Sequence, residues 1–172
     1  MEIKIESKKM LKSFFGFNTF KGKQQACIES ILKGKDVFVV MPTGGGKSLC
    51  YQLPSLILEG TSIIISPLIA LMKNQVDSIR SNSKDNSIAH FFNSSLSEKE
   101  KSEVINDIKN KKTKILYVAP ETICNTKNLD IFKQINISFF AIDEAHCISE
   151  WGHDFRPEYK KIRSSINALK RT

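Results

Sequence analysis

The sequence lacks any long apolar run. Its 172 residues contain no hydrophobic stretch near the roughly 18 residues that a membrane-spanning helix requires. The first nine residues also lack the hydrophobic segment of a secretory signal. We therefore expect neither secretion nor membrane insertion, and no membrane as a partner.

Closely spaced cysteine pairs are absent as well. The chain has four cysteines and no C-x-x-C pattern, which argues against a zinc ribbon or a thioredoxin-type redox motif. We interpret Cys27, Cys50, Cys124 and Cys147 as free thiols in a reducing compartment, where a cysteine commonly serves as a small buried hydrophobe.

Acidic side chains are too few to balance the basic ones. The sequence has 18 Asp and Glu against 26 Lys and Arg, a formal net charge of +8. Such a charge favours polyanionic partners. A hydrophobic content of 41% at this length is enough for one sizeable core.

Five short apolar runs are continuous rather than alternating, which is typical of strands buried on both faces of a parallel sheet. They cover residues 36–41, 61–65, 88–92, 114–118 and 137–142. Helical periodicity between them predicts helices at 24–32 and 68–79, and a capping box at Ser97 and Glu100 predicts a third. We predict an α/β domain of three layers around a mostly parallel sheet.

A glycine-rich turn follows the first of these runs. It reads Pro42-Thr43-Gly44-Gly45-Gly46-Lys47-Ser48. Successive glycines let backbone amides face an anion, and a following helix adds its positive end. We expect Lys47 to contact nucleotide phosphates and Ser48 to bind Mg²⁺. The alternative is a chance glycine turn, since Met41 stands where the strict motif has glycine.

An acidic pair, Asp143 and Glu144, directly follows the run at 137–142. Ligands of open α/β sheets bind at the carboxyl ends of strands. We expect Asp143 to hold Mg²⁺ through water, and Glu144 to deprotonate an attacking water. The alternative is an acidic first turn favoured by a helix dipole. His146 is either a relay at the catalytic site that senses the nucleotide and communicates with the bound strand, or a buried structural histidine.

Longer stretches around these motifs resemble the first motor lobe of RecQ-type superfamily 2 DNA helicases. The matching stretches are residues 41–52, 66–76 and 143–159, so that the resemblance covers about residues 14–160. It implies a RecA-like P-loop fold, ATP and Mg²⁺ as cofactors, and single-stranded or partly duplex DNA as a partner. The implied activity is ATP-dependent 3′ to 5′ DNA unwinding in repair and recombination.

The resemblance implies roles for the segment before the phosphate loop. Gln24 matches the glutamine that reads the adenine edge, and Phe17 stands where the family commonly has a tyrosine beside the adenine. Lys21 is implied as a further nucleotide contact, and Thr43 to Ser48 as phosphate contacts. The alternatives are core packing for Phe17 and a surface amide for Gln24.

DNA contacts are implied in the same way. The implied residues are Ser66, Pro67, Lys73, Asn93, Ser94, Trp151, His153, Phe155 and Arg156. Hydroxyls and amides hold the DNA backbone without reading its sequence. Aromatic rings, here Trp151, Phe155 and Tyr159, can stack on unpaired bases. The alternatives are helix capping for the polar turns and internal packing for the aromatic rings.

The family also has parts that this sequence does not show: a Ser-Ala-Thr motif, a second RecA-like lobe with its arginine finger, a zinc-binding cysteine cluster and a winged helix. We expect residues 1–172 to form the first lobe, incomplete at its C-terminal end. Because phosphoryl transfer generally needs that arginine, we expect the chain alone to be a weak or inactive ATPase.

Two other functions stay open at this point: a nucleotide- or nucleic-acid-binding module that hydrolyses nothing, and a lobe of an RNA helicase. The expected location is the cytoplasm, with association to the nucleoid in a bacterium. Nothing in the sequence indicates an oligomeric state.

Overall fold

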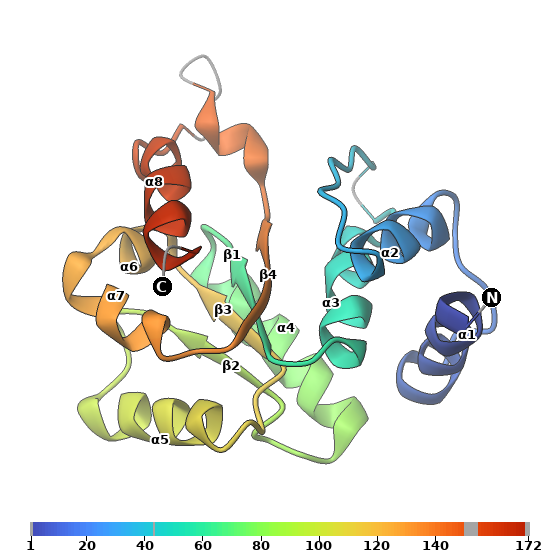
Figure 1. Cartoon of the computed structure of the whole chain (residues 1–172), viewed down its shortest axis with the longest axis horizontal. Helices are drawn as coiled ribbons and strands as arrows, with labels where there is room; N and C mark the ends of the chain where they lie inside the picture. The colour runs from blue at the N-terminus through green and yellow to red at the C-terminus, as the bar shows by residue number, and fades with distance from the viewer. Residues whose placement is uncertain (1, 43, 150–154, 171–172) are drawn as a thin grey trace. The chain divides into compact units, whose positions relative to one another are not determined.

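The computed structural model describes residues 2–42, 44–149 and 155–170. The chain consists of two compact units, Met1–Glu59 and Gly60–Thr172 (Figure 1). Within the described ranges, no helix is both long and apolar enough to cross a membrane. All four cysteines are free thiols, as the sequence predicts.

The first unit is helical. Its helices are α1 (Glu2–Phe15), α2 (Gln24–Leu32) and α3 (Lys47–Ile57). They pack around Leu11, Ile28, Leu49 and Leu53. Helix α2 has the bounds that hydrophobic periodicity predicts, and α3 begins directly after the glycine-rich turn.

The strand predicted at residues 36–41 is wrong. This segment has no regular secondary structure, and the side chains of Phe38 and Val40 are 85% and 82% exposed. A strand is stabilised by backbone hydrogen bonds to a neighbouring strand. The described residues of the first unit include no second strand, so the apolar run has no partner in its own unit.

The second unit holds the sheet and the remaining helices. In chain order the elements are β1 (Thr61–Ile65), α4 (Ile69–Ser83), β2 (Ala89–Phe92), α5 (Glu98–Lys109), β3 (Ile115–Val118), α6 (Pro120–Cys124), α7 (Thr126–Lys133), β4 (Ile137–Ile142), the 3₁₀ helix η1 (Ala145–Ile148) and α8 (Glu158–Lys170). The other four predicted strands are thus confirmed. The capping box before α5 is also present: Ser97 Oγ accepts from the Glu100 amide, and the Glu100 carboxylate accepts from the Ser97 amide.

The four strands form a parallel sheet in the order β2-β3-β1-β4. Ile65 is in register with Val118 and Ile142, and Phe92 is in register with Val118. The last residues of all four strands are therefore level. The turns that follow these strands all leave from one edge of the sheet, which is where the predicted sites of this unit lie.

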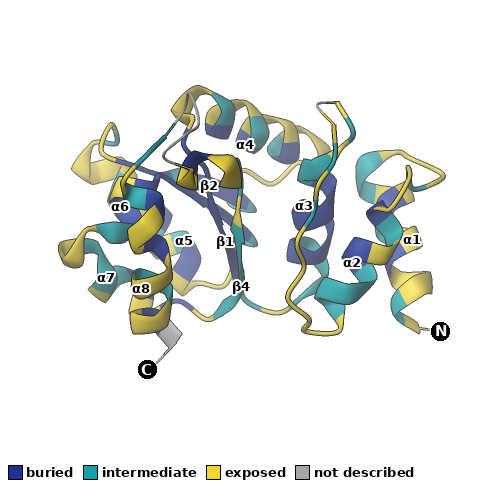
Figure 2. Ribbon diagram, turned by 90° about the horizontal axis from the view of Figure 1, so that it is seen from above, coloured by how far each residue is buried: buried dark blue, intermediate teal, exposed yellow. Residues whose placement is uncertain are grey.

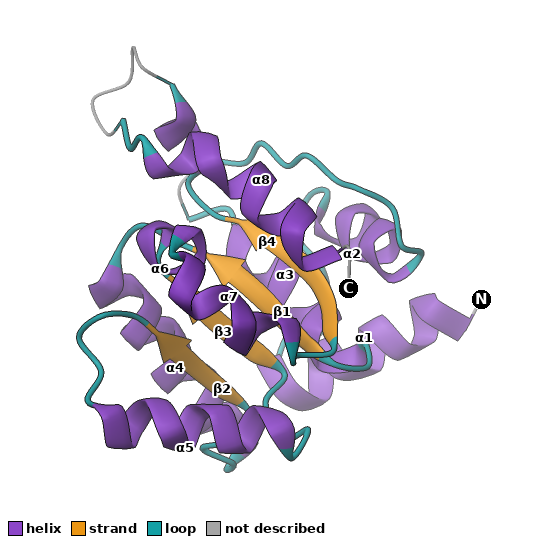
Figure 3. Cartoon of the chain, turned by 60° about the vertical axis from the view of Figure 1, so that its left-hand side comes forward, coloured by secondary structure: helices purple, strands orange, loops and turns teal. Residues whose placement is uncertain are grey.

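Helices cover both faces of the sheet, which confirms the predicted three layers. On one face, α5, α6, α7 and α8 pack against residues of β1 and β3 that include Ile63 and Leu116. On the other face lies α4, which turns its buried residues towards the strands (Figures 2 and 3).

A buried histidine links three elements of the second unit. The Arg80 guanidinium on α4 donates from Nη2 to His90 Nδ1 at 2.8 Å, so that His90 carries its proton on Nε2. His90 Nε2 then donates to Asp107 Oδ2 on α5 at 3.1 Å. Burial and the positive charge of Arg80 lower the pKa of His90, and the carboxylates of Asp107 and Asp85 oppose this shift.

This arrangement predicts an acid-sensitive fold. In the unfolded chain His90 regains a pKa of about 6.5, so below that pH the unfolded state binds a proton that the folded state excludes. The free energy of unfolding is therefore expected to fall as the pH drops from about 6.5 towards the lowered pKa of the folded state. Urea unfolding at several pH values measures this slope. His90→Gln should flatten it, and an unchanged slope in that variant would contradict the assignment.

Candidate nucleotide and nucleic-acid site

The glycine-rich turn requires glycine at each of its three central positions. Gly44 and Gly46 have φ angles of 78° and 77°, a left-handed conformation that side chains disfavour. A Cβ atom on Gly45 would lie 2.9 Å from the Pro42 carbonyl oxygen. Thr43, which directly precedes these glycines, lies outside the described residues.

The turn opens into the N-terminus of α3. Gly46 is the N-cap, and among the described residues no side chain caps the helix there. Lys47 folds back over the turn, with Nζ donating to the Met41 carbonyl oxygen at 3.4 Å. A helix N-terminus and an ammonium group therefore both lie at this turn. This donor set fits the phosphates of a nucleotide, and the Ser48 hydroxyl is an oxygen ligand of the kind that Mg²⁺ prefers.

Gln24 supports the phosphate loop directly. Its side chain is buried, Oε1 accepts from the Lys21 amide at 2.8 Å, and Nε2 donates to the carbonyl oxygens of Gly46 at 3.1 Å and Gly45 at 3.4 Å. A surface amide, the alternative for Gln24, is therefore wrong. No local sequence pattern reveals a contact between residues 22 positions apart. The contact of Gln24 with adenine stays a prediction.

Phe17 lies in the connection between α1 and α2 with 53% of its surface exposed, and the Lys21 side chain is also exposed. Core packing, the alternative for Phe17, is not what the structure shows. An exposed ring and a cation are available to a ligand on this side of the first unit.

The acidic turn follows β4 and is held by its backbone. The Asp143 amide donates to the Ile65 carbonyl oxygen of β1 at 2.8 Å. Glu144 has a φ of 50°, which is unusual for a residue other than glycine. Asp143 Oδ1 accepts from the Glu144 amide at 3.0 Å, and the Tyr159 hydroxyl donates to the Asp143 carbonyl oxygen at 2.8 Å.

Two side chains of this turn contact each other. His146 Nδ1 lies 3.3 Å from Glu144 Oε2, and the His146 side chain is 59% exposed. The alternative of a buried structural histidine is therefore wrong. Carboxylate oxygens just past the end of β4 are suitable ligands for a hydrated Mg²⁺ ion, and a carboxylate paired with imidazole is suited to accepting a proton.

Two buried polar atoms lie at the carboxyl edge of the sheet. Ser66 follows β1 and Asn93 follows β2, and both residues are 1% exposed. Within the described part of the chain, Ser66 Oγ and Asn93 Nδ2 have no hydrogen-bond partner, although Asn93 Oδ1 accepts from the Ser95 amide at 2.9 Å. Buried polar groups are nearly always satisfied, so two such atoms at one edge indicate a place for a ligand.

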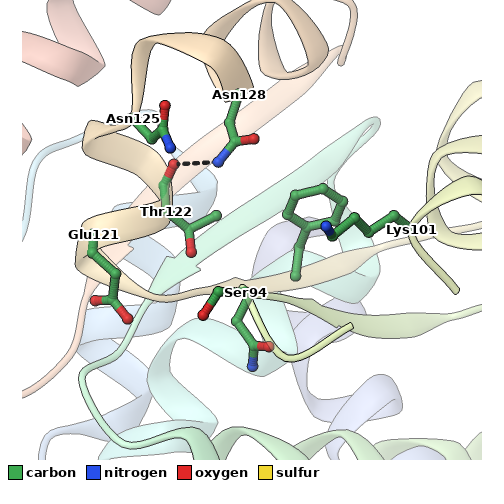
Figure 4. A pocket seen from close by; sticks show the side chains of 8 residues that line it. Ser94, Lys101, Glu121, Thr122, Asn125 and Asn128 are labelled. Atoms are coloured by element: carbon green, nitrogen blue, oxygen red, sulfur yellow. Dashed lines mark hydrogen bonds between the residues drawn. The ribbon is translucent and has the colours of Figure 1, made fainter. Parts of the chain in front are cut away.

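Asn93 also lines a pocket of about 300 Å³ in the second unit. Its lining is polar apart from one ring and comprises Phe92, Asn93, Ser94, Lys101, Glu121, Thr122, Asn125 and Asn128. Figure 4 shows these side chains, with Asn128 Nδ2 donating to the Thr122 carbonyl oxygen at 3.0 Å. The sequence resemblance includes Asn93, Ser94 and Glu121 as parts of turns that contact the DNA backbone. It misses Lys101, Thr122, Asn125 and Asn128, because only the fold brings them to this pocket.

The other predicted DNA contacts differ in exposure. Lys73 lies on the exposed face of α4, whereas Pro67 is buried. Phe155 and Arg156 are partly buried, with Lys160 Nζ 5.6 Å from the Phe155 ring centroid. Trp151 and His153 lie outside the described residues.

Tyr159 departs from the prediction. Base stacking by its ring is wrong, because Tyr159 is only 3% exposed and belongs to the hydrophobic core between the sheet and α8. The sequence shows only an aromatic residue near other aromatic residues, and that pattern is the same for a stacking ring and for a core ring.

The family model and the relatives described next are all helicases. The family model described as DEAD/DEAH box helicase matches residues 21–172. The chain is 49% identical over 152 residues to the probable ATP-dependent DNA helicase RecS of Bacillus subtilis, covering 88% of this chain and 30% of that protein. It is 46% identical over 153 residues to the ATP-dependent DNA helicase RecQ of Pasteurella multocida, covering 89% of this chain and 24% of that protein.

The chain thus spans less than a third of the length of these relatives. Among solved structures, the DUF1998 helicase MrfA superposes with a TM-score of 0.69 over 97% of this chain and 26% of its own, at 21% identity, which shows a shared fold. The resemblance to RecQ-type helicases is confirmed by the named relatives, and the chain belongs to the DEAD/DEAH box helicase family.

Proposed function

We propose that the chain is the N-terminal motor lobe of an ATP-dependent 3′ to 5′ DNA helicase that acts in repair or recombination in the cytoplasm. Its membership of the helicase family and its identity to proteins named as DNA helicases support this function. A second RecA-like lobe, as the resemblance implies, would supply the arginine that offsets charge in the transition state.

Residues of the first unit are assigned to the nucleotide. The amides of the glycine turn and Lys47 hold the phosphates, and Ser48 is a ligand of Mg²⁺. Gln24 contacts the adenine edge, Phe17 lies beside the adenine ring, and Lys21 makes a further contact with the nucleotide. Two left-handed glycines and a helix N-terminus without a side-chain cap among the described residues support these roles, since such a turn can present backbone amides to an anion.

Residues of the second unit are assigned to hydrolysis and DNA. Asp143 contacts Mg²⁺ through water, and Glu144 accepts the proton of the attacking water. His146 is a relay that senses the nucleotide and communicates with the bound DNA strand. Bound Mg²⁺ supplies positive charge to the transferred phosphate. The remaining assigned contacts are with the DNA backbone, at Ser66, Pro67, Lys73, Asn93, Ser94, Trp151, His153, Phe155 and Arg156.

The observation that carries the DNA assignment is the buried, unpartnered pair of polar atoms on Ser66 and Asn93. A phosphate oxygen accepts from both a hydroxyl and an amide nitrogen. Both atoms lie just past strand ends that the sheet register brings level. Both atoms are buried in the free chain, so the turns after β1 and β2 must open for a DNA phosphate to reach them. Such backbone contacts read no bases, which suits a motor that translocates over any sequence.

Replacing Asn93 with aspartate tests this assignment. Asn93→Asp keeps the Oδ1 atom that accepts from Ser95 but replaces the unpartnered donor with an acceptor. We expect the affinity of the chain for oligo(dT) to fall about tenfold or more, because a hydrogen bond to a charged group is lost. Fluorescence anisotropy at low salt measures it, and Asn106→Asp, on the exposed surface of α5, is the control with the same change in net charge.

The same titration separates the proposal from its alternatives. Equal losses of oligo(dT) affinity in both variants would show that the change in net charge causes the loss and that Asn93 does not contact the DNA. Tighter binding of an RNA oligonucleotide of equal length would favour an RNA helicase lobe, and a wild-type chain that binds neither strand at low salt would contradict the nucleic-acid assignment.

A further inference from the structure

We propose that Tyr159 is a positioning residue that holds the acidic turn of Asp143 and Glu144 in its working conformation. The inference rests on the proposed function, which gives this turn its role towards Mg-ATP. It rests on geometry as well: the Tyr159 hydroxyl, on a residue that is 3% exposed, donates to the Asp143 carbonyl oxygen at 2.8 Å.

The acidic turn requires hydrogen bonds that hold it, because the backbone of Glu144 adopts the left-handed conformation. A non-glycine residue at a φ of 50° is strained, and it persists only where surrounding contacts hold it. Here the Asp143 amide is held by β1, and the Cys147 amide donates to the Glu144 carbonyl oxygen at 2.9 Å. Tyr159 adds the contact to the carbonyl group of the peptide unit that links Asp143 to Glu144.

Tyr159 is itself firmly placed. It lies in the first turn of α8, its ring packs in the core with Ile162 and Cys147, and its amide donates to the Arg156 carbonyl oxygen at 3.0 Å. The Arg156 amide in turn donates to the Cys147 carbonyl oxygen at 2.9 Å. Burial raises the pKa of Tyr159, so the hydroxyl keeps its proton and remains a donor across the physiological pH range.

Short hydrogen-bonded steps therefore connect the start of α8 to the acidic turn. Phe155 and Arg156, which are assigned to DNA, stand four and three residues before Tyr159. A displacement of the start of α8 would be transmitted to the Asp143 carbonyl group through the Tyr159 hydroxyl. A core side chain without a hydroxyl group could not make this hydrogen bond to the Asp143 carbonyl oxygen.

Tyr159→Phe in the 172-residue chain isolates the hydroxyl, because the ring and its packing remain. The matched control is Tyr117→Phe in β3: Tyr117 is buried, and since its neighbours Leu116 and Val118 face the core of α5 to α8, its side chain points to the opposite face of the sheet. Hydrogen exchange without nucleotide is measured on the peptide that covers residues 143–148. ATP affinity is then measured with Mg²⁺ and with EDTA.

We expect exchange of this peptide to rise about threefold to tenfold in Tyr159→Phe, after correction for global stability, and not in Tyr117→Phe. The gain in ATP affinity on adding Mg²⁺ should shrink about threefold or more, while affinity in EDTA stays unchanged. Wild-type exchange together with an undiminished Mg²⁺ gain would overturn the positioning role. A wild-type chain without any Mg²⁺ gain would instead contradict the proposed function of Asp143, which is a distinguishable result.

Discussion

Lys47→Ala is expected to weaken Mg-ATP binding by about tenfold to a hundredfold, because the ammonium group makes charge-assisted hydrogen bonds to phosphate that alanine cannot replace. Its effect on folding should be small. In the structure Lys47 Nζ reaches the Met41 carbonyl oxygen at 3.4 Å, a long contact of little strength. Titration of the chain with a fluorescent ATP analogue measures the affinity, and thermal unfolding verifies the fold.

Lys35→Ala is the matched control for this prediction. It removes the same charge from an exposed position between α2 and the glycine turn, in the same unit. Its ATP affinity should stay within about twofold of wild type, since exposed charges are largely screened at physiological salt. Equal affinity in Lys47→Ala and Lys35→Ala would show that Lys47 does not contact the phosphates and would overturn the phosphate-loop assignment.

Much of the second unit was predictable because its signals are local. Four apolar runs became β1 to β4, and the capping box at Ser97 marks the start of α5 to within a residue. The acidic pair lies just past the end of β4, as predicted, because the continuous apolar run at 137–142 marks that strand. Continuous hydrophobicity and a capping pattern each depend on neighbours within a few residues.

The incorrect or missing parts depend on contacts between distant residues. The run at 36–41 has the composition of a strand, but composition cannot supply the partner whose hydrogen bonds make a strand. The sequence pattern groups Tyr159 with stacking aromatic residues, and only the packing of α8 on the sheet shows that its hydroxyl donates to the Asp143 carbonyl oxygen. The support that Gln24 gives to the phosphate loop likewise appears only when α2 and α3 are packed together.

That support leads to a second large effect, at Gly46. Gly46→Ala forces a side chain into a left-handed conformation, at a cost of about 1–2 kcal/mol. The new Cβ would also collide with the Gln24 side-chain nitrogen and displace it from the Gly45 and Gly46 carbonyl oxygens. We expect Mg-ATP affinity to fall at least about tenfold, because a deformed loop no longer presents its donors to one anion.

Gly34→Ala separates the two causes of this loss. Gly34 has a φ of 71°, close to the 77° of Gly46, but a Cβ there meets no atom of the described residues within 4 Å. This variant should lose similar backbone stability and keep its ATP affinity. Adding Gln24→Ala to Gly46→Ala removes the collision, so the double variant should lose less affinity than the sum of the single losses predicts. Strict additivity, measured by nucleotide titration of all four chains of the cycle, would show that Gln24 and Gly46 act independently and that the loop does not depend on this amide.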